Sequence, residues 1–166
     1  MKIIFLFALC FFNTMVFALE DISYVDASTP IAEIKDIHRQ AEAWAMCAAA
    51  YDATSEVLSE SQPGRAKQFS ELANGAELAV LISIVWDGLK PDLTPEAFDA
   101  LWTAAKVAGS ELPKTRRTFL LAEAETFFAK LGETVKVCAS NLESQQKYID
   151  TWRELAKSGL LQLPSD

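Results

Sequence analysis

The stretch Ala41-Glu42-Ala43-Trp44-Ala45-Met46-Cys47-Ala48-Ala49-Ala50-Tyr51 decides the fold class of this chain. Apolar residues continue on both sides of it at intervals of three or four, from Ile34 to Leu58. That spacing is typical of one face of an α-helix, and Thr29-Pro30 supplies an N-cap residue followed by a first-turn proline. We therefore predict one long helix over about residues 30–60.

Four more helical segments follow, each bounded by proline or glycine. The first of them should be central, because its middle is apolar on most sides. Strand patterns are nearly absent, so we predict an all-α, single-domain bundle of about five helices. The four segments run over about 66–86, 94–108, 113–132 and 135–159, with Gly109 and Gly132 predicted to end the third and fourth helices.

Residues 1–18 have the composition of a secretory signal peptide: a positive start at Lys2, an apolar stretch, and a small residue at Ala18. The stretch is short and polar for a membrane span, which needs about 20 apolar residues. We predict cleavage after Ala18, with Cys10 leaving in the signal, and a single domain over 19–166. The expected location is periplasmic or secreted.

Two cysteines, Cys47 and Cys138, remain in the exported chain. Exported proteins meet an oxidising compartment, so we predict one disulfide between them; the alternative is two buried free thiols. Such a bridge closes a loop of about 90 residues and fastens the first long helix to the last.

Acidic composition limits the classes of partner. The 166 residues contain 15 Lys and Arg against 23 Asp and Glu, a formal net charge of -8. Nucleic-acid binding needs clustered positive charge, so we expect none. The longest later apolar run, Leu78–Trp86, is too short to span a bilayer, so we expect no stable membrane anchor after signal cleavage.

Metal and cofactor sites are not indicated by the sequence. His38 and Glu42 share a helix face, but zinc needs three or four ligands and there is no second histidine. A surface histidine beside Glu42 is the simpler interpretation. Phosphate loops, haem-attachment motifs and nucleophile elbows are also absent from the sequence, so we predict no metal, no cofactor and no catalytic residue.

One short pattern points to an enzyme. Glu143-Ser144 is followed by Gly159-Leu160-Leu161-Gln162-Leu163-Pro164. This pair resembles the Glu-Ser and Gly-Leu-Met-Gln motifs of lysozyme-like lytic transglycosylases, which implies a carboxylate-based cell-wall glycosidase with Glu143 as its acid. In that family the acid lies early in the domain and a Gly-Ala precedes the second motif, where this chain has Ala156-Lys157-Ser158. We rank this function third.

Three residues are candidates for a binding surface. Trp86 ends the second predicted helix beside Asp87, whereas the other tryptophans (Trp44, Trp102 and Trp152) fall on apolar stripes typical of core. Arg116 and Arg117 form a small basic island that can dock an anionic group, although such clusters more often balance nearby acids.

The function that these features favour is a non-enzymatic protein-binding module, such as an immunity or inhibitor protein, with a basic partner. The alternative is a carrier that holds a small apolar ligand between helices, lined by aromatic residues. Its candidate lining is the set Phe69, Phe98, Phe119, Phe127 and the four tryptophans.

Overall fold

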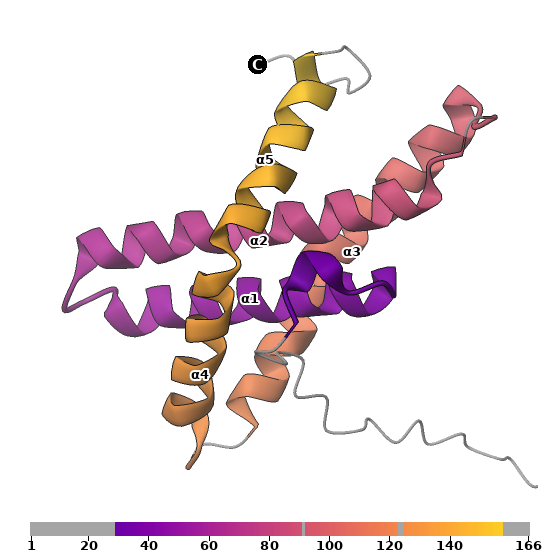
Figure 1. Cartoon of the computed structure of the whole chain (residues 1–166). Coiled ribbons are helices and arrows are strands. Elements are labelled where there is room, and N and C mark those ends of the chain that lie inside the picture. The colour runs from indigo at the N-terminus through magenta and orange to yellow at the C-terminus, as the bar shows by residue number, and fades with distance from the viewer. Residues whose placement is uncertain (1–28, 91, 123–124, 158–166) are drawn as a thin grey trace, which may run out of the picture.

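The computed structural model describes residues 29–90, 92–122 and 125–157 (Figure 1). All regular secondary structure in these ranges is helical, which confirms the predicted all-α bundle of five helices. The proposed signal segment and Cys10 lie outside the described residues. The elements are a short 3-10 helix η1 (Ile31–Glu33), α1 (Ile37–Leu58), α2 (Pro63–Gly88), α3 (Pro95–Leu121), α4 (Phe127–Ser140) and α5 (Leu142–Lys157).

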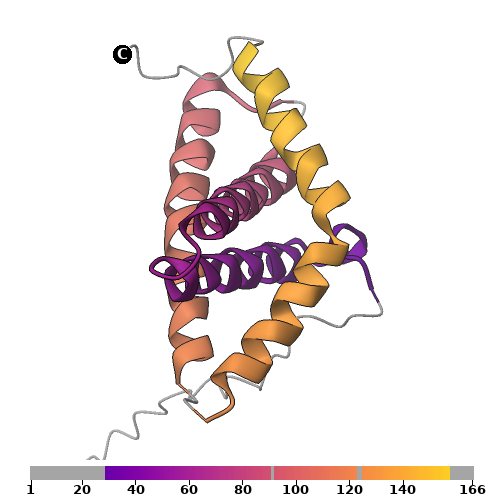
Figure 2. The same cartoon turned by 90° about the vertical axis from the view of Figure 1, so that its left-hand side faces the viewer.

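The helices form three layers (Figure 2). The antiparallel hairpin of α1 and α2 is the middle layer; α3 crosses one side of it, and α4 and α5 follow one another along the other side. Helix α1 contacts α2, α3 and α4, while α2 contacts α1, α3 and α5. Both middle helices are therefore covered from two directions.

Small residues make this arrangement possible. Every residue of α1 from Gln40 to Ala53 is buried except Glu42 and Asp52, and most of the others are alanines. Alanine has the highest helix propensity and keeps the helix narrow, so neighbouring helices approach it on several sides. Trp44 and Tyr51 supply the bulk: the Trp44 ring meets Tyr148 of α5 at 5.5 Å between centroids, and the Tyr51 ring meets Phe69 of α2 at 6.0 Å.

The start of α1 differs from the prediction. Thr29-Pro30 begins only the short helix η1, and α1 starts at Ile37, where the Asp36 carboxylate accepts hydrogen bonds from the backbone N–H groups of His38 and Arg39. Ile34, between the two helices, has an extended backbone. A side-chain cap at the first turn stabilises a helix by about 1 kcal/mol, and here that cap comes from Asp36.

The predicted third helix and the first part of the predicted fourth belong to one helix, α3, so the predicted stop at Gly109 is wrong; the rest of the predicted fourth helix, 127–132, begins α4. Thr94 caps α3 and Pro95 occupies its first turn, as expected, but the helix continues through Gly109 and Pro113 to Leu121. A proline inside a helix removes one backbone hydrogen bond and clashes with the preceding turn. Burial compensates for this cost, because α3 has one continuous buried stripe: Ala105, Gly109, Pro113, Arg116 and Leu120.

The predicted fifth helix is divided in two, and Gly132 lies inside α4 rather than at a helix end. The division falls at Asn141, whose side-chain oxygen accepts a hydrogen bond from the Ile31 backbone N–H at 2.8 Å and whose amide donates to the Val137 carbonyl at 3.0 Å. The bond with Ile31 ties the end of α4 to η1, and the bond with Val137 fixes the Asn141 side chain against the last turn of α4. Cys138 therefore belongs to α4, and not to the last helix as predicted.

Helix α2 is also longer than the apolar run seen in the sequence. By length and composition alone it could cross a membrane, with a mean hydropathy of 1.3 over its most apolar window. In this fold 44% of that window is buried against other elements. A core helix of a soluble bundle meets the same criteria.

Candidate functional site

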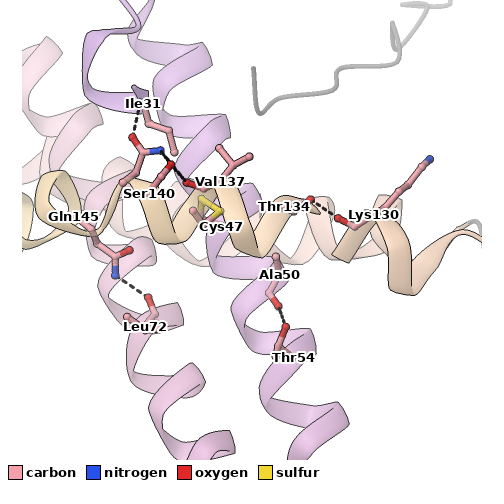
Figure 3. Close-up of a disulfide and its surroundings, with 12 residues drawn as sticks. Ile31, Cys47, Ala50, Thr54, Leu72, Lys130, Thr134, Val137, Ser140 and Gln145 are labelled. Carbon is pink, nitrogen blue, oxygen red and sulfur yellow. Dashed lines mark hydrogen bonds between the residues drawn. A yellow bond between two sulfur atoms is a disulfide. The ribbon is translucent and has the colours of Figure 1, made fainter. Parts of the chain in front are cut away.

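The disulfide between Cys47 and Cys138 joins α1 to α4 (Figure 3). The two sulfur atoms are bonded at 2.01 Å, and both residues are fully buried. Its neighbours are core residues and backbone hydrogen-bonding groups, with Ile31 and Val137 on one side and Ala50 on the other (Figure 3). Its position between packed helices indicates a structural role.

The two candidate arginines face α1. Arg116 is buried, and its Nη2 lies 2.8 Å from the Glu42 carboxylate, which we expected beside His38. Arg117 is partly exposed and pairs with both Asp52 and Glu56. The two acids that interrupt the buried surface of α1 therefore meet the arginines of α3, and this joins the outer layer to the middle one.

Glu77 of α2 lies near this cluster of charges. Partial burial raises the pKa of its carboxyl above the ordinary value, the negative charge of Asp52 raises it further, and Lys114 opposes both effects. A carboxyl whose pKa is raised binds its proton more readily. The Glu77 carboxyl therefore holds its proton to a higher pH than an ordinary glutamate does.

Trp86 stands at the C-terminal end of α2, and 65% of its surface is exposed. It forms one wall of a pocket of about 370 Å³ between the start of α1, the end of α2 and the side of α5. This volume is at the lower end of the range for ligand sites in proteins. The lining consists of Ala32, Ile37, Gln40, Ser83, Trp86, Lys147, Tyr148 and Thr151.

The floor of this pocket is a buried hydrogen-bond network centred on Gln40. Its Nε2 donates to the backbone carbonyls of Ile31 at 3.1 Å and Ile34 at 3.3 Å. Its Oε1 accepts from the Tyr148 hydroxyl at 2.9 Å and from the Ser83 hydroxyl at 3.3 Å. All four hydrogen-bonding positions of the amide are therefore used, and the network joins η1, α1, α2 and α5.

The sequence alone did not identify Gln40, Ser83 or Tyr148 as site residues. The available signal was a polar residue within an apolar pattern: Ser83 interrupts the Leu78–Trp86 run, and Gln40 precedes the alanine-rich stretch of α1. That signal shows that a partner is needed for a buried polar group, but it does not say which residue supplies it.

Glu143, the acid of the proposed glycosidase, lies in the first turn of α5. Its side chain is 88% exposed, and its carboxylate is 3.1 Å from the Lys147 ammonium. A catalytic acid needs a buried or apolar environment that raises its pKa, and this position is solvated. The second part of that pattern, 159–164, lies outside the described residues.

Metal ligands do not gather in the part of the chain that the structure describes: it contains no group of three or more His, Cys, Asp or Glu side chains that could hold an ion. Several other apolar residues are exposed as well: Leu89 lies three residues after Trp86 and is 42% exposed, and Phe119, Leu121 and Phe128 around the junction of α3 and α4 are 40%, 51% and 70% exposed.

The Trp86 pocket is therefore the candidate functional site, because it combines an exposed aromatic wall with buried polar groups. Comparison with known proteins adds nothing to this choice: no protein-family model, no curated protein and no solved structure matches the chain.

Proposed function

We propose that this chain is an exported, acidic, non-enzymatic binding module for a basic protein, in the manner of an immunity or inhibitor protein, and that it engages its partner through the Trp86 pocket. The observation that carries this proposal is the exposure of Trp86 above the network of Gln40, Ser83 and Tyr148. Exposed tryptophans beside structured pockets contribute a large share of binding energy at protein interfaces.

The charge of the chain supports a basic partner. Its formal net charge is -8, and complementary charge accelerates encounter and improves selectivity. Arg116 and Arg117, which were candidates for a basic docking surface, are engaged with acids of α1. We therefore assign the recognition role to Trp86 and leave the arginines a structural one.

Two features support a periplasmic or secreted location. Residues 1–18 have the composition of an export signal, and the Cys47–Cys138 disulfide is consistent with an oxidising compartment. We place the mature protein there, with cleavage after Ala18.

The test is affinity purification of the exported protein from a periplasmic extract, with the wild type, Trp86→Ala and Phe128→Ala in parallel. Phe128 is a matched control because it is equally aromatic, 70% exposed and on a different helix. We expect one basic protein to be retained by the wild type and by Phe128→Ala, to be lost with Trp86→Ala, and to elute as salt is raised. Retention that is equal in all three variants, or no retained protein at low salt, would contradict the proposal.

A carrier of a small ligand is the second candidate, favoured by the pocket itself, since about 370 Å³ is enough for a small molecule. The phenylalanines expected to line a carrier site do not form this wall: Phe69 packs on Tyr51 in the core, and Phe98 stacks on Trp102. Native mass spectrometry after extraction separates the two candidates. A retained small molecule supports the carrier, and a retained protein supports the binding module.

A further inference from the structure

We infer that the Trp86 pocket receives an arginine side chain of the basic partner. The inference rests on the proposed function and names the chemical group that the pocket recognises. It is derived from the directions of the hydrogen bonds that the lining residues already make.

The orientation of the Gln40 amide is fixed by its surroundings. One end of the amide faces two backbone carbonyls, those of Ile31 and Ile34, which only accept hydrogen bonds. That end must therefore be the NH2 group. The opposite end is the oxygen, and the hydroxyl groups of Ser83 and Tyr148 that face it must donate their protons to it.

The proton of the third hydroxyl in the lining is also already used, because the Thr151 hydroxyl donates it to the backbone carbonyl of Lys147 at 2.9 Å. A hydroxyl has a single proton but two lone pairs. Ser83 is fully buried, so the hydroxyls that can reach a bound group are those of Tyr148 and Thr151, and these offer only acceptors. A group that bonds to these hydroxyls must supply N–H or O–H donors, and a carboxylate or phosphate finds no donor among them.

The wall of the pocket favours a cation among the possible donors. Trp86 is the best aromatic partner for a cation placed over its face, and 65% of its surface is available. Guanidinium fits better than ammonium, because it is planar, weakly hydrated and carries five donors that can reach several acceptors while its face lies on the indole. The net charge of -8 favours the same choice.

Lys147 is the opposing charge in the lining. Its ammonium is 3.1 Å from the Glu143 carboxylate, and its side chain is 72% exposed, so its repulsion is compensated and screened by solvent. The charge still has a measurable consequence. Removal of Lys147 should strengthen the binding of a cation and weaken the binding of an anion, which distinguishes the two kinds of ligand by sign.

The experiment is calorimetric titration of the full exported chain with three blocked tripeptides, acetyl-Gly-X-Gly-amide, in which X is arginine, citrulline or glutamate. We expect the arginine peptide to bind most tightly. Citrulline keeps the planar shape but has a carbonyl oxygen in place of one NH2 group and carries no charge, so it should bind several-fold more weakly. Trp86→Leu should weaken arginine binding at least tenfold, while Phe128→Leu leaves it unchanged and Lys147→Met strengthens it. Thermal unfolding of each variant checks that it folds.

The inference is overturned if the arginine peptide does not bind, if the glutamate peptide binds better, or if Lys147→Met weakens arginine binding. Its failure is distinguishable from failure of the proposed function. A protein partner that is lost with Trp86→Ala, in the absence of arginine binding, leaves the proposed function standing. If the arginine peptide binds but no protein partner is retained, the pocket's preference for arginine stands and the proposed function fails.

Discussion

Gln145 of α5 occupies the space that a side chain at Gly75 of α2 would need. Its amide nitrogen lies where a Cβ at Gly75 would overlap it, and that nitrogen donates a hydrogen bond of 2.9 Å to the Leu72 carbonyl. Ile149 closes the same contact from the next turn, 3.2 Å from the position of that Cβ. The absence of a side chain at Gly75 therefore sets how closely α5 approaches the middle layer.

Gly75→Ala should lower the free energy of unfolding by about 1–3 kcal/mol, because the added methyl forces Gln145 out of its buried hydrogen bond. Gly132→Ala is the matched control in α4: nothing lies within 4 Å of its added Cβ, so it should stabilise the protein by up to about 1 kcal/mol through helix propensity. Urea unfolding of both variants measures the difference. Equal effects would mean that α5 does not dock at Gly75.

Removal of the disulfide in the double variant Cys47→Ala/Cys138→Ala should destabilise the fold by up to about 4–5 kcal/mol in the chain-entropy model, since the bridge closes a loop of 91 residues. Both cysteines are fully buried, so the disulfide should resist reduction in the native protein. The same reductant should reduce it readily once the protein is unfolded in urea. The checks are urea unfolding and thiol alkylation with mass spectrometry. Free alkylation of both thiols in the protein as purified from cells would show that the bridge does not form.

Arg116→Ala should destabilise the protein by about 3 kcal/mol, because it leaves the partly buried Glu42 carboxylate without its partner. Arg117→Ala is the comparison: its partners Asp52 and Glu56 are 53% and 70% exposed, so its loss should cost no more than about 1 kcal/mol. A double-mutant cycle of Arg116→Ala with Glu42→Ala measures the coupling. A coupling of zero would show that the pair contributes nothing to stability.

Tyr51 should make the fold sensitive to alkali. Burial raises the pKa of its hydroxyl from 10.0 to about 12, and in the described part of the chain this hydroxyl has no hydrogen-bond partner. The unfolded chain loses the proton near pH 10 while the folded chain retains it, so stability is full below pH 10 and falls as pH rises toward 12. The loss attributable to Tyr51 is about 2–3 kcal/mol.

The control for Tyr51 is the Tyr51→Phe variant. The free energy of unfolding of both proteins is measured in urea between about pH 8 and pH 12, the range in which tyrosine titrates. The variant should match or exceed wild-type stability at pH 8, because it removes a buried hydroxyl without a partner. Its stability should then decline less steeply above pH 10. Parallel curves for the two proteins would contradict the assignment of the alkaline loss to Tyr51.

Local signals in the sequence predicted the features that depend on a few neighbouring residues. The three- and four-residue apolar spacing gave the helical class, and Thr94-Pro95 marked the true start of α3. The expected removal of Cys10 with the signal segment left two cysteines, which predicted the Cys47–Cys138 pairing. These inferences succeed because helix periodicity, capping and disulfide pairing leave short, recognisable patterns.

The predicted helix boundaries were wrong where contacts with distant residues outweighed a local sequence signal. Gly109 and Pro113 are helix-breaking residues and predicted helix ends. Helix α3 continues through them because its buried stripe packs against α1 and α2. Asn141 gave no strong stop signal, yet it separates α4 from α5 because its side chain bonds to Ile31, 110 residues away. Burial and long-range hydrogen bonds contribute more free energy than the propensity of one residue.

The sequence by itself determined that this chain is helical, which cysteines pair, and that Trp86 differs from the other tryptophans. Only the tertiary structure decided that Gln40, Ser83 and Tyr148 meet beneath Trp86, and that Arg116 and Arg117 face inward to α1. The physical reason is that a helix pattern shows which face of a helix is buried but not which helix covers it. The direction of each hydrogen bond in the pocket depends on η1, α1, α2 and α5, which the chain brings together only when it folds.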